Sequence, residues 1–287
     1  MYQFFTTMQV PRGGQLMLLS VFFASLVNLG IKRLRHIPIA EIIFFMSLVS
    51  LLTSTVALRC RKLSVWGQHR GLLLARGLAG TLGIGLYFFT LQHLLLPSAV
   101  AFRRMAPIFS TLLGIFVVKE PVRWQQWLFF TLSFAGVVLV NGLAFAGASW
   151  YMLAGVMGAL FSGLSNNLIG KIKYREHPLV IAFYSDLVAM LLTGAYLLHN
   201  FVALQAQDVL LLGAISVLSV LAHYYTVKAY QYGPVVVVSA TGYVAVIYAL
   251  LLGRIHEREE LPMRQLVGIV SVLLGTLLNL FYKQKRS

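Results

Sequence analysis

The stretch IFSTLLGIFVVKE at residues 108–120 returns 139 positions later as IYALLLGRIHERE at residues 247–259. The identical pairs are Ile108 and Ile247, Leu112 and Leu251, Leu113 and Leu252, Gly114 and Gly253, and Glu120 and Glu259. The same spacing carries Gln126 onto Gln265 and Gly136 onto Gly275. A repeat of this length is the feature from which the fold is predicted.

Further matches lie upstream, where the spacing is 140 residues. They pair Ser25, Gly30, Arg35 and Pro38 with Ser165, Gly170, Arg175 and Pro178. Chance similarity between leucine-rich helices produces matches at leucine, whereas these fall on glycine, proline, glutamine and glutamate. The sequence therefore predicts two diverged copies, at residues 1–145 and 146–287.

The composition excludes an ordinary soluble protein. The 287 residues are 59% hydrophobic and only 11% charged, whereas a soluble domain has roughly 45–50% apolar and about 25% charged residues. Disorder requires low hydrophobicity, and a disulfide scaffold requires more cysteine than the single Cys60. The composition predicts a chain that is embedded in a lipid bilayer.

Apolar runs that end at charges or prolines define ten predicted spans. They cover about residues 15–31, 38–58, 71–93, 97–118, 124–142, 150–170, 178–198, 208–230, 234–253 and 262–282. Six prolines mark helix starts, but Pro107 lies inside a span, where it is predicted to bend the helix as a hinge. The fold class is therefore an all-α polytopic membrane protein with ten transmembrane helices.

Five helices in each copy imply that the second copy enters the membrane upside down. Inverted five-helix repeats are typical of alternating-access transporters, because exchanging the conformations of the two copies opens one site to opposite sides. This pattern predicts a secondary transporter in which a central cavity lies between the copies.

The basic residues predict an orientation. The net charge is +15, and the loops near residues 59–70, 119–123 and 171–175 and the C-terminal end hold about twice as many basic residues as the opposite loops. The positive-inside rule places these loops and both termini in the cytoplasm, as expected in a cell (inner) membrane. Membrane topology accounts for the basic residues without nucleic acid, and no cleavable signal peptide is evident.

The pattern ARGLAG…YFFTLQHLLLPSAVAFRRMAPIFSTLLGIFVVKEPVRWQQW…GVVLV resembles the EamA-like branch of the drug/metabolite transporter superfamily. The features that carry the resemblance are Arg76-Gly77, Pro97, Pro107 and Glu120. Across residues 15–282 it implies ten helices, cytoplasmic termini and a central cavity. The second copy departs from the pattern, because Val246 stands where the equivalent of Pro107 is usual.

Ionisable side chains inside the predicted spans are candidates for function, because their insertion costs at least about 2.5 kcal/mol each. Arg76 and Arg103 each share a helix face with small or polar residues, so both are predicted to bind substrate. A guanidinium can bind a carboxylate or phosphate through two hydrogen bonds. Because cations exceed acids inside the spans, the sequence favours an anionic solute.

The remaining candidate residues are less distinctive. Glu41, Asp186, Arg104 and His223 are predicted to form ion pairs or to carry a coupling proton, while Tyr87, Asn28, Tyr184, Lys228 and Tyr243 are further candidates for substrate binding. Each has a simpler structural interpretation as well. Lys228 and Arg104 can extend to the headgroups, the asparagine can join helices, and the tyrosines can pack in the interior.

Several kinds of chemistry lack their motifs. The sequence has no cluster of histidine and cysteine with metal-ligand spacing, no phosphate-binding loop for ATP and no nucleophile–base motif, so we predict no metal, no cofactor and no enzymatic activity. The alternative cargo is an amino-acid-like or cationic metabolite or drug, including an adenosyl-sulfonium compound. An integral-membrane lipid enzyme ranks below both. The residues leave the coupling ion and oligomeric state open, with protons and a homodimer as candidates.

Overall fold

The computed structural model describes residues 12–117, 124–141, 149–172, 176–232, 241–242, 244–256 and 262–284. These residues form helices and no strand. The helices are α1 (Arg12–Arg33), α2 (Ile39–Cys60), α3 (Arg70–His93), α4 (Leu96–Arg103), α5 (Ala106–Val117), α6 (Trp124–Asn141), α7 (Ser149–Ile172), α8 (Pro178–Asn200), α9 (Ala206–Tyr232), α11 (Val244–His256) and α12 (Met263–Gln284).

Every predicted apolar span contains at least one of these helices. The span predicted at residues 97–118 is divided into α4 and α5, which are separated by Arg104 and Met105. Pro107 is the second residue of α5. A proline lacks the N–H that a continuous helix needs at this position, so the chain turns before it and begins a new helix.

Six helices of the described chain are long and apolar enough to cross a membrane, which is fewer than the ten predicted spans. They are α1, α2, α3, α7, α8 and α9; in α7 and α9 the suitable stretches are Trp150–Ile169 and Ala206–Thr226. The division at Pro107 leaves α4 and α5 each too short to cross alone. In the second copy, α11 is likewise a shorter apolar helix.

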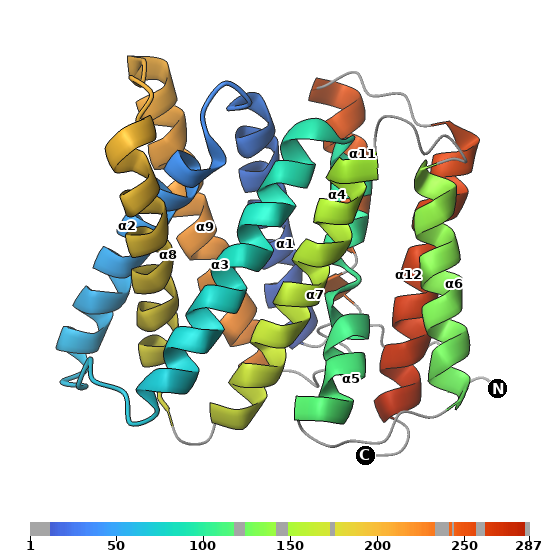
Figure 1. Cartoon of the computed structure of the whole chain (residues 1–287), viewed down its shortest axis with the longest axis horizontal. Helices are drawn as coiled ribbons and strands as arrows, with labels where there is room; N and C mark the ends of the chain where they lie inside the picture. Colours follow the sequence, from blue (N-terminus) through green and yellow to red (C-terminus); the bar gives the residue numbers. More distant parts are fainter. Residues whose placement is uncertain are drawn as a thin grey trace.

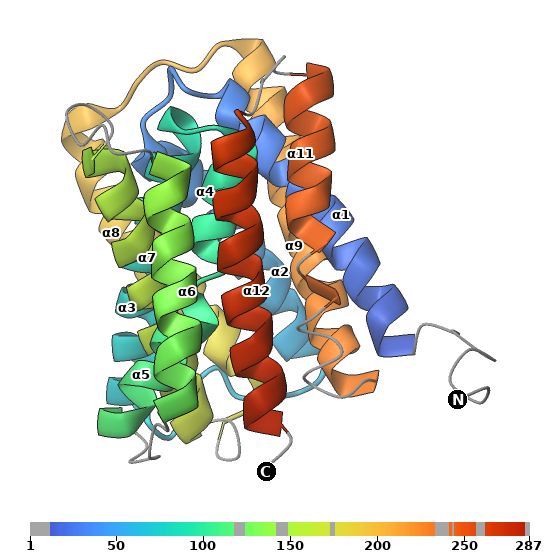
Figure 2. The ribbon, with the colours of Figure 1, turned by 90° about the vertical axis from the view of Figure 1, so that its right-hand side faces the viewer.

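The helices run side by side, with their connections gathered at two opposite ends (Figures 1 and 2). The most extensive packing joins α1 to α9, α3 to α7, α2 to α8 and α6 to α12, so each of these pairs combines a helix from residues 1–145 with one from residues 146–287. The first residue of α1 and the last residue of α12 lie at the same end of the molecule (Figure 1).

Glycines allow two of these pairs to approach closely. A Cβ atom at Gly83 of α3 would lie 2.7 Å from Ser162 Oγ and 3.0 Å from Ser162 N of α7, and Gly158 of α7 faces the Gly83 carbonyl. On α1, Gly30 lies against the side chain of Ile215 of α9. Small residues bring membrane helices into this kind of close backbone contact.

The outer surface has exposed apolar side chains, as expected for contact with lipid, and exposed tryptophans near helix ends, as expected at the membrane–water interfaces. Large apolar side chains such as Leu52, Val56 and Leu191 are exposed along α2 and α8. All four tryptophans are also exposed: Trp66 lies between α2 and α3, Trp124 and Trp127 in the first turn of α6, and Trp150 at the start of α7. Tryptophan at helix ends is typical of the two membrane–water interfaces.

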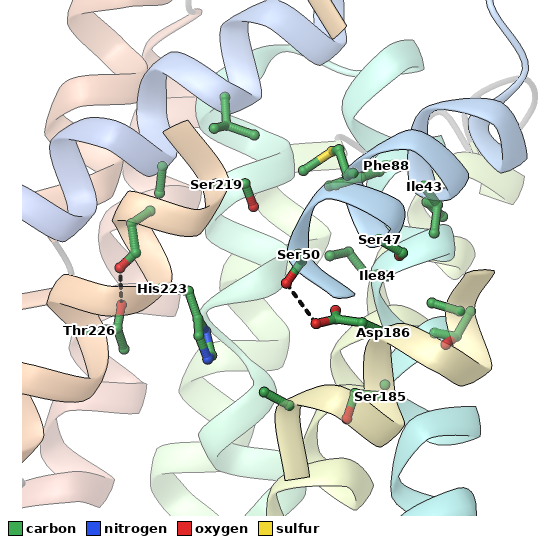
Figure 3. Close-up of a pocket in the computed structure, with 18 of the residues that line it drawn as sticks. Ile43, Ser47, Ser50, Ile84, Phe88, Ser185, Asp186, Ser219, His223 and Thr226 are labelled. Atoms are coloured by element: carbon green, nitrogen blue, oxygen red, sulfur yellow. Dashed lines mark hydrogen bonds between the residues drawn. The ribbon is translucent and has the colours of Figure 1, made fainter. Parts of the chain in front are cut away.

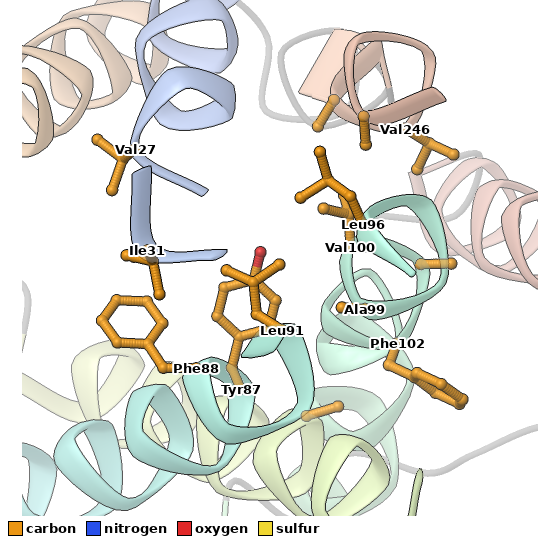
Figure 4. Close-up of a cluster of buried hydrophobic side chains, with 14 of the residues drawn as sticks. Val27, Ile31, Tyr87, Phe88, Leu91, Leu96, Ala99, Val100, Phe102 and Val246 are labelled. Atoms are coloured by element: carbon orange, nitrogen blue, oxygen red, sulfur yellow. The ribbon is translucent and has the colours of Figure 1, made fainter. Parts of the chain in front are cut away.

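Two apolar clusters pack the interior. The larger one gathers Val27 and Ile31 of α1, Phe88 and Leu91 of α3, and Val100 of α4, and it extends to Val246 of α11 (Figure 4). The smaller cluster joins α2, α3, α7 and α8 through residues that include Leu58, Leu73, Ile172, Val180 and Tyr184. Along α2, α3 and α8, a stretch with many polar side chains lies between the two clusters.

Candidate functional site

A cavity of about 380 Å³ occupies this polar stretch and is lined by residues of α1, α2, α3, α4, α8 and α9. Its charged and titratable lining residues are Arg76, Arg103, Asp186 and His223. Hydroxyl groups line much of the rest, from Ser20, Ser47, Ser50, Thr81, Ser185, Ser219 and Thr226 (Figure 3). A cavity of this size and polarity can hold a small organic molecule.

Asp186 of α8 is held in place by a serine of the other copy. Ser50 Oγ of α2 donates a hydrogen bond of 2.6 Å to Asp186 Oδ2, and both side chains point toward the cavity (Figure 3). Asp186 lies one helical turn beyond Ala182, and both residues line the cavity, so this face of α8 presents the carboxylate to the cavity.

Arg76 of α3 lines the same cavity as Asp186. Within the described chain, Arg76 forms no ion pair with Asp186 at 4 Å or less, and its buried Nε atom has no hydrogen-bond partner. Gly77 and Gly80 follow Arg76 along the lining, and they let α3 pack closely against Val188 of α8 and Ser165 of α7. Arg76 therefore offers hydrogen-bond donors to a molecule in the cavity.

Arg103 reaches the cavity from the last turn of α4, just before the break that precedes Pro107. Its Cζ atom lies 4.5 Å from the centre of the Tyr87 ring, which is a cation–π contact. Tyr87 itself is only 4% exposed and does not line the cavity. The predicted substrate residue Tyr87 thus contacts Arg103 and supports its position.

The structure brings five predicted site residues to one cavity: Asn28, Arg76, Arg103, Asp186 and His223. Asn28 comes from α1 and His223 from α9, so the lining combines helices of both copies (Figure 3 shows His223). Sequence periodicity selected these residues one helix at a time. The packing of α1 against α9 and of α3 against α8 and α4 is what assembles them.

Other predicted site residues lie elsewhere. Tyr184 packs in the smaller apolar cluster, Lys228 Nζ lies 4.6 Å from the centre of the Tyr224 ring, and Arg104 approaches Gly242 rather than the cavity. Glu41 is fully buried in the first turn of α2, where its Oε2 accepts a hydrogen bond of 3.4 Å from Val202 N. Tyr243 lies outside the described residues, and Pro107 is described only through its backbone.

The sequence interpretation missed the hydroxyl groups of the lining. Ser47 and Ser50 stand three residues apart on α2, and Ser54 continues the polar stripe one turn later. This spacing places serines on one face of an otherwise apolar helix, which is the signal that could have identified Ser50 as the partner of Asp186.

Comparison with known proteins identifies the family of this chain. The model of the EamA-like transporter family matches the chain twice, at residues 11–142 and 149–281. The chain belongs to the EamA-like transporter family. It is therefore a multi-pass membrane protein of a transporter family, and the family resemblance predicted from the sequence is confirmed.

Curated relatives are also transporters. The pseudopaline exporter CntI of Pseudomonas aeruginosa strain PAO1 is 27% identical over 239 residues, which cover 82% of this chain and 84% of that protein. A protein of Helicobacter pylori strain J99 described as an uncharacterized transporter is 22% identical over 211 residues, or 71% of each chain. One crystal structure shares the fold, with a TM-score of 0.67 and 16% identity over 96% of this chain and 99% of its own.

Proposed function

We propose that this EamA-like family member is a secondary transporter that moves a small organic anion by alternating access around the central cavity. The observation that carries the proposal is the charge of the lining: Arg76 and Arg103 face one cavity in which Asp186 is the single acidic side chain among the described lining residues. The proposed cargo bears a carboxylate or a phosphate group.

The physical argument is that the described lining residues hold two guanidinium groups, of Arg76 and Arg103, but one carboxylate, that of Asp186. An uncompensated cation inside the bilayer is costly, and an anionic solute supplies the missing charge while binding. Arginine can hold a carboxylate or phosphate through two parallel hydrogen bonds. The serine and threonine hydroxyls can then bind the polar remainder of the solute.

The packing of the helices supports the proposed inverted repeats at residues 1–145 and 146–287. Exchanging the copies replaces α1 by α7, α2 by α8, α3 by α9 and α6 by α12. Under this exchange, the contact of α1 with α9 becomes the contact of α7 with α3, and the contact of α3 with α8 becomes that of α9 with α2. The contacts of α2 with α8 and of α6 with α12 are each exchanged into themselves. All of these contacts occur in the structure. The two family matches divide the chain at the same place.

Two further observations support the direction and orientation of the proposed transport. The relative CntI is named as an exporter, which favours outward movement of the cargo. The start of α1 and the end of α12 lie at one end of the molecule (Figure 1), as expected when both termini are cytoplasmic in an inner membrane. Asp186 is the proposed counter-charge of Arg76, and it is also the proposed proton carrier if transport responds to a pH gradient.

The test is uptake of a metabolite mixture into proteoliposomes with and without a pH gradient, measured by mass spectrometry. Arg76→Gln and Arg103→Gln should abolish accumulation of anions, whereas Arg59→Gln, at the exposed end of α2, should not. Accumulation of cations that survives Arg76→Gln and disappears with Asp186→Asn would contradict the proposal. That result would favour the alternative cationic cargo, for which Asp186 in the cavity is the supporting observation.

A further inference from the structure

Two contacts between a histidine and a carboxylate join the copies outside the cavity. His36 Nε2, between α1 and α2, lies 3.0 Å from Asp208 Oδ1 in the first turn of α9. His69 Nδ1, which precedes α3, lies 3.5 Å from Glu176 Oε1, which precedes α8. In both contacts the histidine belongs to residues 1–145 and the acid to residues 146–287.

The two contacts lie at opposite ends of the helix bundle. Figure 1 shows the turn between α1 and α2 and the start of α9 at one end, and the starts of α3 and α8 at the other. The predicted orientation makes the His36–Asp208 end the outer end and the His69–Glu176 end the inner end. We refer to the His36–Asp208 contact as the outer latch and to the His69–Glu176 contact as the inner latch.

The sequence repeat relates the two latches. A shift of 140 residues carries His36 onto Glu176, and a shift of 139 carries His69 onto Asp208. The spacing of 140 also aligns residues 25–38 with residues 165–178, so His36 and Glu176 are equivalent positions. Near α3 the spacing is 136, because α3 begins at Arg70 and α9 at Ala206, so His69 corresponds to Gln205, three residues before Asp208. The two latches therefore lie at corresponding ends of the two copies with acid and base reversed, although the second pair of positions matches only approximately.

Each carboxylate makes a second contact that fixes it near the start of an equivalent helix. Glu176 Oε1 accepts a hydrogen bond of 2.7 Å from His69 N ahead of α3, and Asp208 Oδ2 accepts one of 3.2 Å from Gln205 N ahead of α9. The acid side chains are 4% and 13% exposed, whereas the His69 and His36 side chains are 32% and 59% exposed. In each contact the acid is thus more buried than the histidine and is held by a second hydrogen bond.

We propose that the outer and inner latches hold the two ends of the cavity closed, and that transport releases them in alternation. The inference rests on the proposed alternating-access function. The latches act on α2, α3, α8 and α9, and these four helices contribute Ser50, Arg76, Asp186 and His223 to the cavity. Rocking of one copy against the other separates the helix ends on one side while it compresses them on the other, so opening one end must break only one latch.

The strength of the contacts suits such a function. A partly exposed imidazole–carboxylate contact is weak compared with a buried ion pair, so thermal motion can break it during a transport cycle. A much stronger contact would hold the transporter in one state, because the cargo can shift the equilibrium between states only by the difference in its affinity for them.

The test measures access to the cavity from each side. In a Cys60→Ser background, Ser219→Cys places a thiol in the lining, and a membrane-impermeant maleimide is added to right-side-out and to inside-out vesicles. Asp208→Asn should raise the labelling rate from the outer end relative to the inner end, and Glu176→Gln should do the opposite. We expect the ratio of the two rates to change roughly two- to fivefold, because a partly exposed contact between a histidine and a carboxylate is weak.

Two further variants separate a latch from a fold-stabilising contact. His69→Gln and His36→Gln leave both carboxylates and their backbone hydrogen bonds in place, so they keep the result interpretable if Glu176→Gln does not fold. They should shift the ratio in opposite directions, and the double variant should return it toward the wild-type value. An unchanged ratio, or a shift in the same direction for both variants, would overturn the proposal.

The labelling experiment requires no substrate, so its result does not depend on the result of the uptake experiment that tests the proposed function. If the two labelling ratios shift in opposite directions but no anion is taken up, the latch proposal stands and the anionic cargo is rejected. Anion uptake that depends on Arg76, with no change in labelling on breaking either latch, would keep the cargo and reject the latches.

Discussion

Ser50 of α2 donates a hydrogen bond of 2.6 Å to Asp186 of α8, and these two residues join the copies at the cavity itself. Hydrogen bonds to charged groups are worth about 1.5–3 kcal/mol. Because Asp186 is the single acid among the described lining residues, this bond fixes where the negative charge of the site lies relative to Arg76. The position of Asp186 therefore depends on the packing of α2 against α8.

Removing the hydroxyl group of Ser50 tests this relationship. Ser50→Ala leaves Asp186 without the donor, and we expect a fall in uptake in proteoliposomes of about tenfold or more, since the lost bond is worth about 1.5–3 kcal/mol. Ser50→Thr keeps a hydroxyl group and should retain most of the uptake. Equal uptake by both variants would show that the bond has no part in transport.

Arg76 should differ from a lysine at the same position. If it binds a carboxylate or phosphate through two hydrogen bonds, Arg76→Lys keeps the charge but loses the planar donor pair. We expect KM for anion uptake to rise roughly tenfold for Arg76→Lys and further for Arg76→Gln. Equal KM values for wild type and Arg76→Lys would indicate that only the positive charge at position 76 contributes to binding of the anion.

Tyr87 should act through the face of its ring. The Arg103 guanidinium lies above that face, with its Cζ atom 4.5 Å from the ring centre, and phenylalanine presents the same face. Tyr87→Phe should therefore transport like the wild type. Tyr87→Leu removes a contact worth about 0.5–2 kcal/mol, and the affinity for the anion should fall by roughly 2- to 30-fold.

Lys228 provides a negative prediction. It was a candidate for substrate binding from the sequence, but its Nζ lies over the Tyr224 ring, and the residue does not line the cavity. Lys228→Gln should leave the KM and maximal rate of anion uptake within about twofold of the wild type, because cation–π contacts at accessible sites are weak. A loss as large as that of Arg76→Gln would place Lys228 in the binding site after all.

Gly83 should be intolerant of a methyl group. An added Cβ would lie 2.7 Å from Ser162 Oγ and 3.0 Å from Ser162 N, so α3 and α7 would have to separate. We expect Gly83→Ala to destabilise the protein by about 1–3 kcal/mol, measured by unfolding in detergent. Gly213→Ala is the matched control, because a Cβ there meets nothing within 4 Å and alanine favours the helix by up to about 1 kcal/mol. Equal stability of the two variants would contradict the packing argument.

The sequence allowed the helices to be located well and the site only in part. Long apolar runs and helix-starting prolines are local signals, so α1, α2 and α8 begin and end close to where they were predicted. The break before Pro107 was also local, since it follows from a missing N–H. We identified Arg76, Arg103 and Asp186 because a charged residue within an apolar run can be recognised from the sequence alone.

The partners of those charges were not predictable from the sequence. Ser50 and Asp186 are 136 residues apart, and the sequence around a serine in an apolar helix does not indicate which residue its hydroxyl group will contact. Tyr184 and Lys228 were selected by residue type and position along a helix, but the rotation of each helix about its axis decides whether such a side chain meets the cavity. That rotation is set by the neighbouring helices.

By itself, the sequence determined that this chain lies in a membrane, that its helices come in two related sets, and which charges require an explanation, because hydrophobicity, proline placement and repeated spacing are properties of the chain in one dimension. Only the tertiary structure decided that Asn28, Arg76, Arg103, Asp186 and His223 share one cavity and that His36 and His69 meet acids of the other copy. The reason is that contacts between the copies depend on how helices more than a hundred residues apart pack face to face.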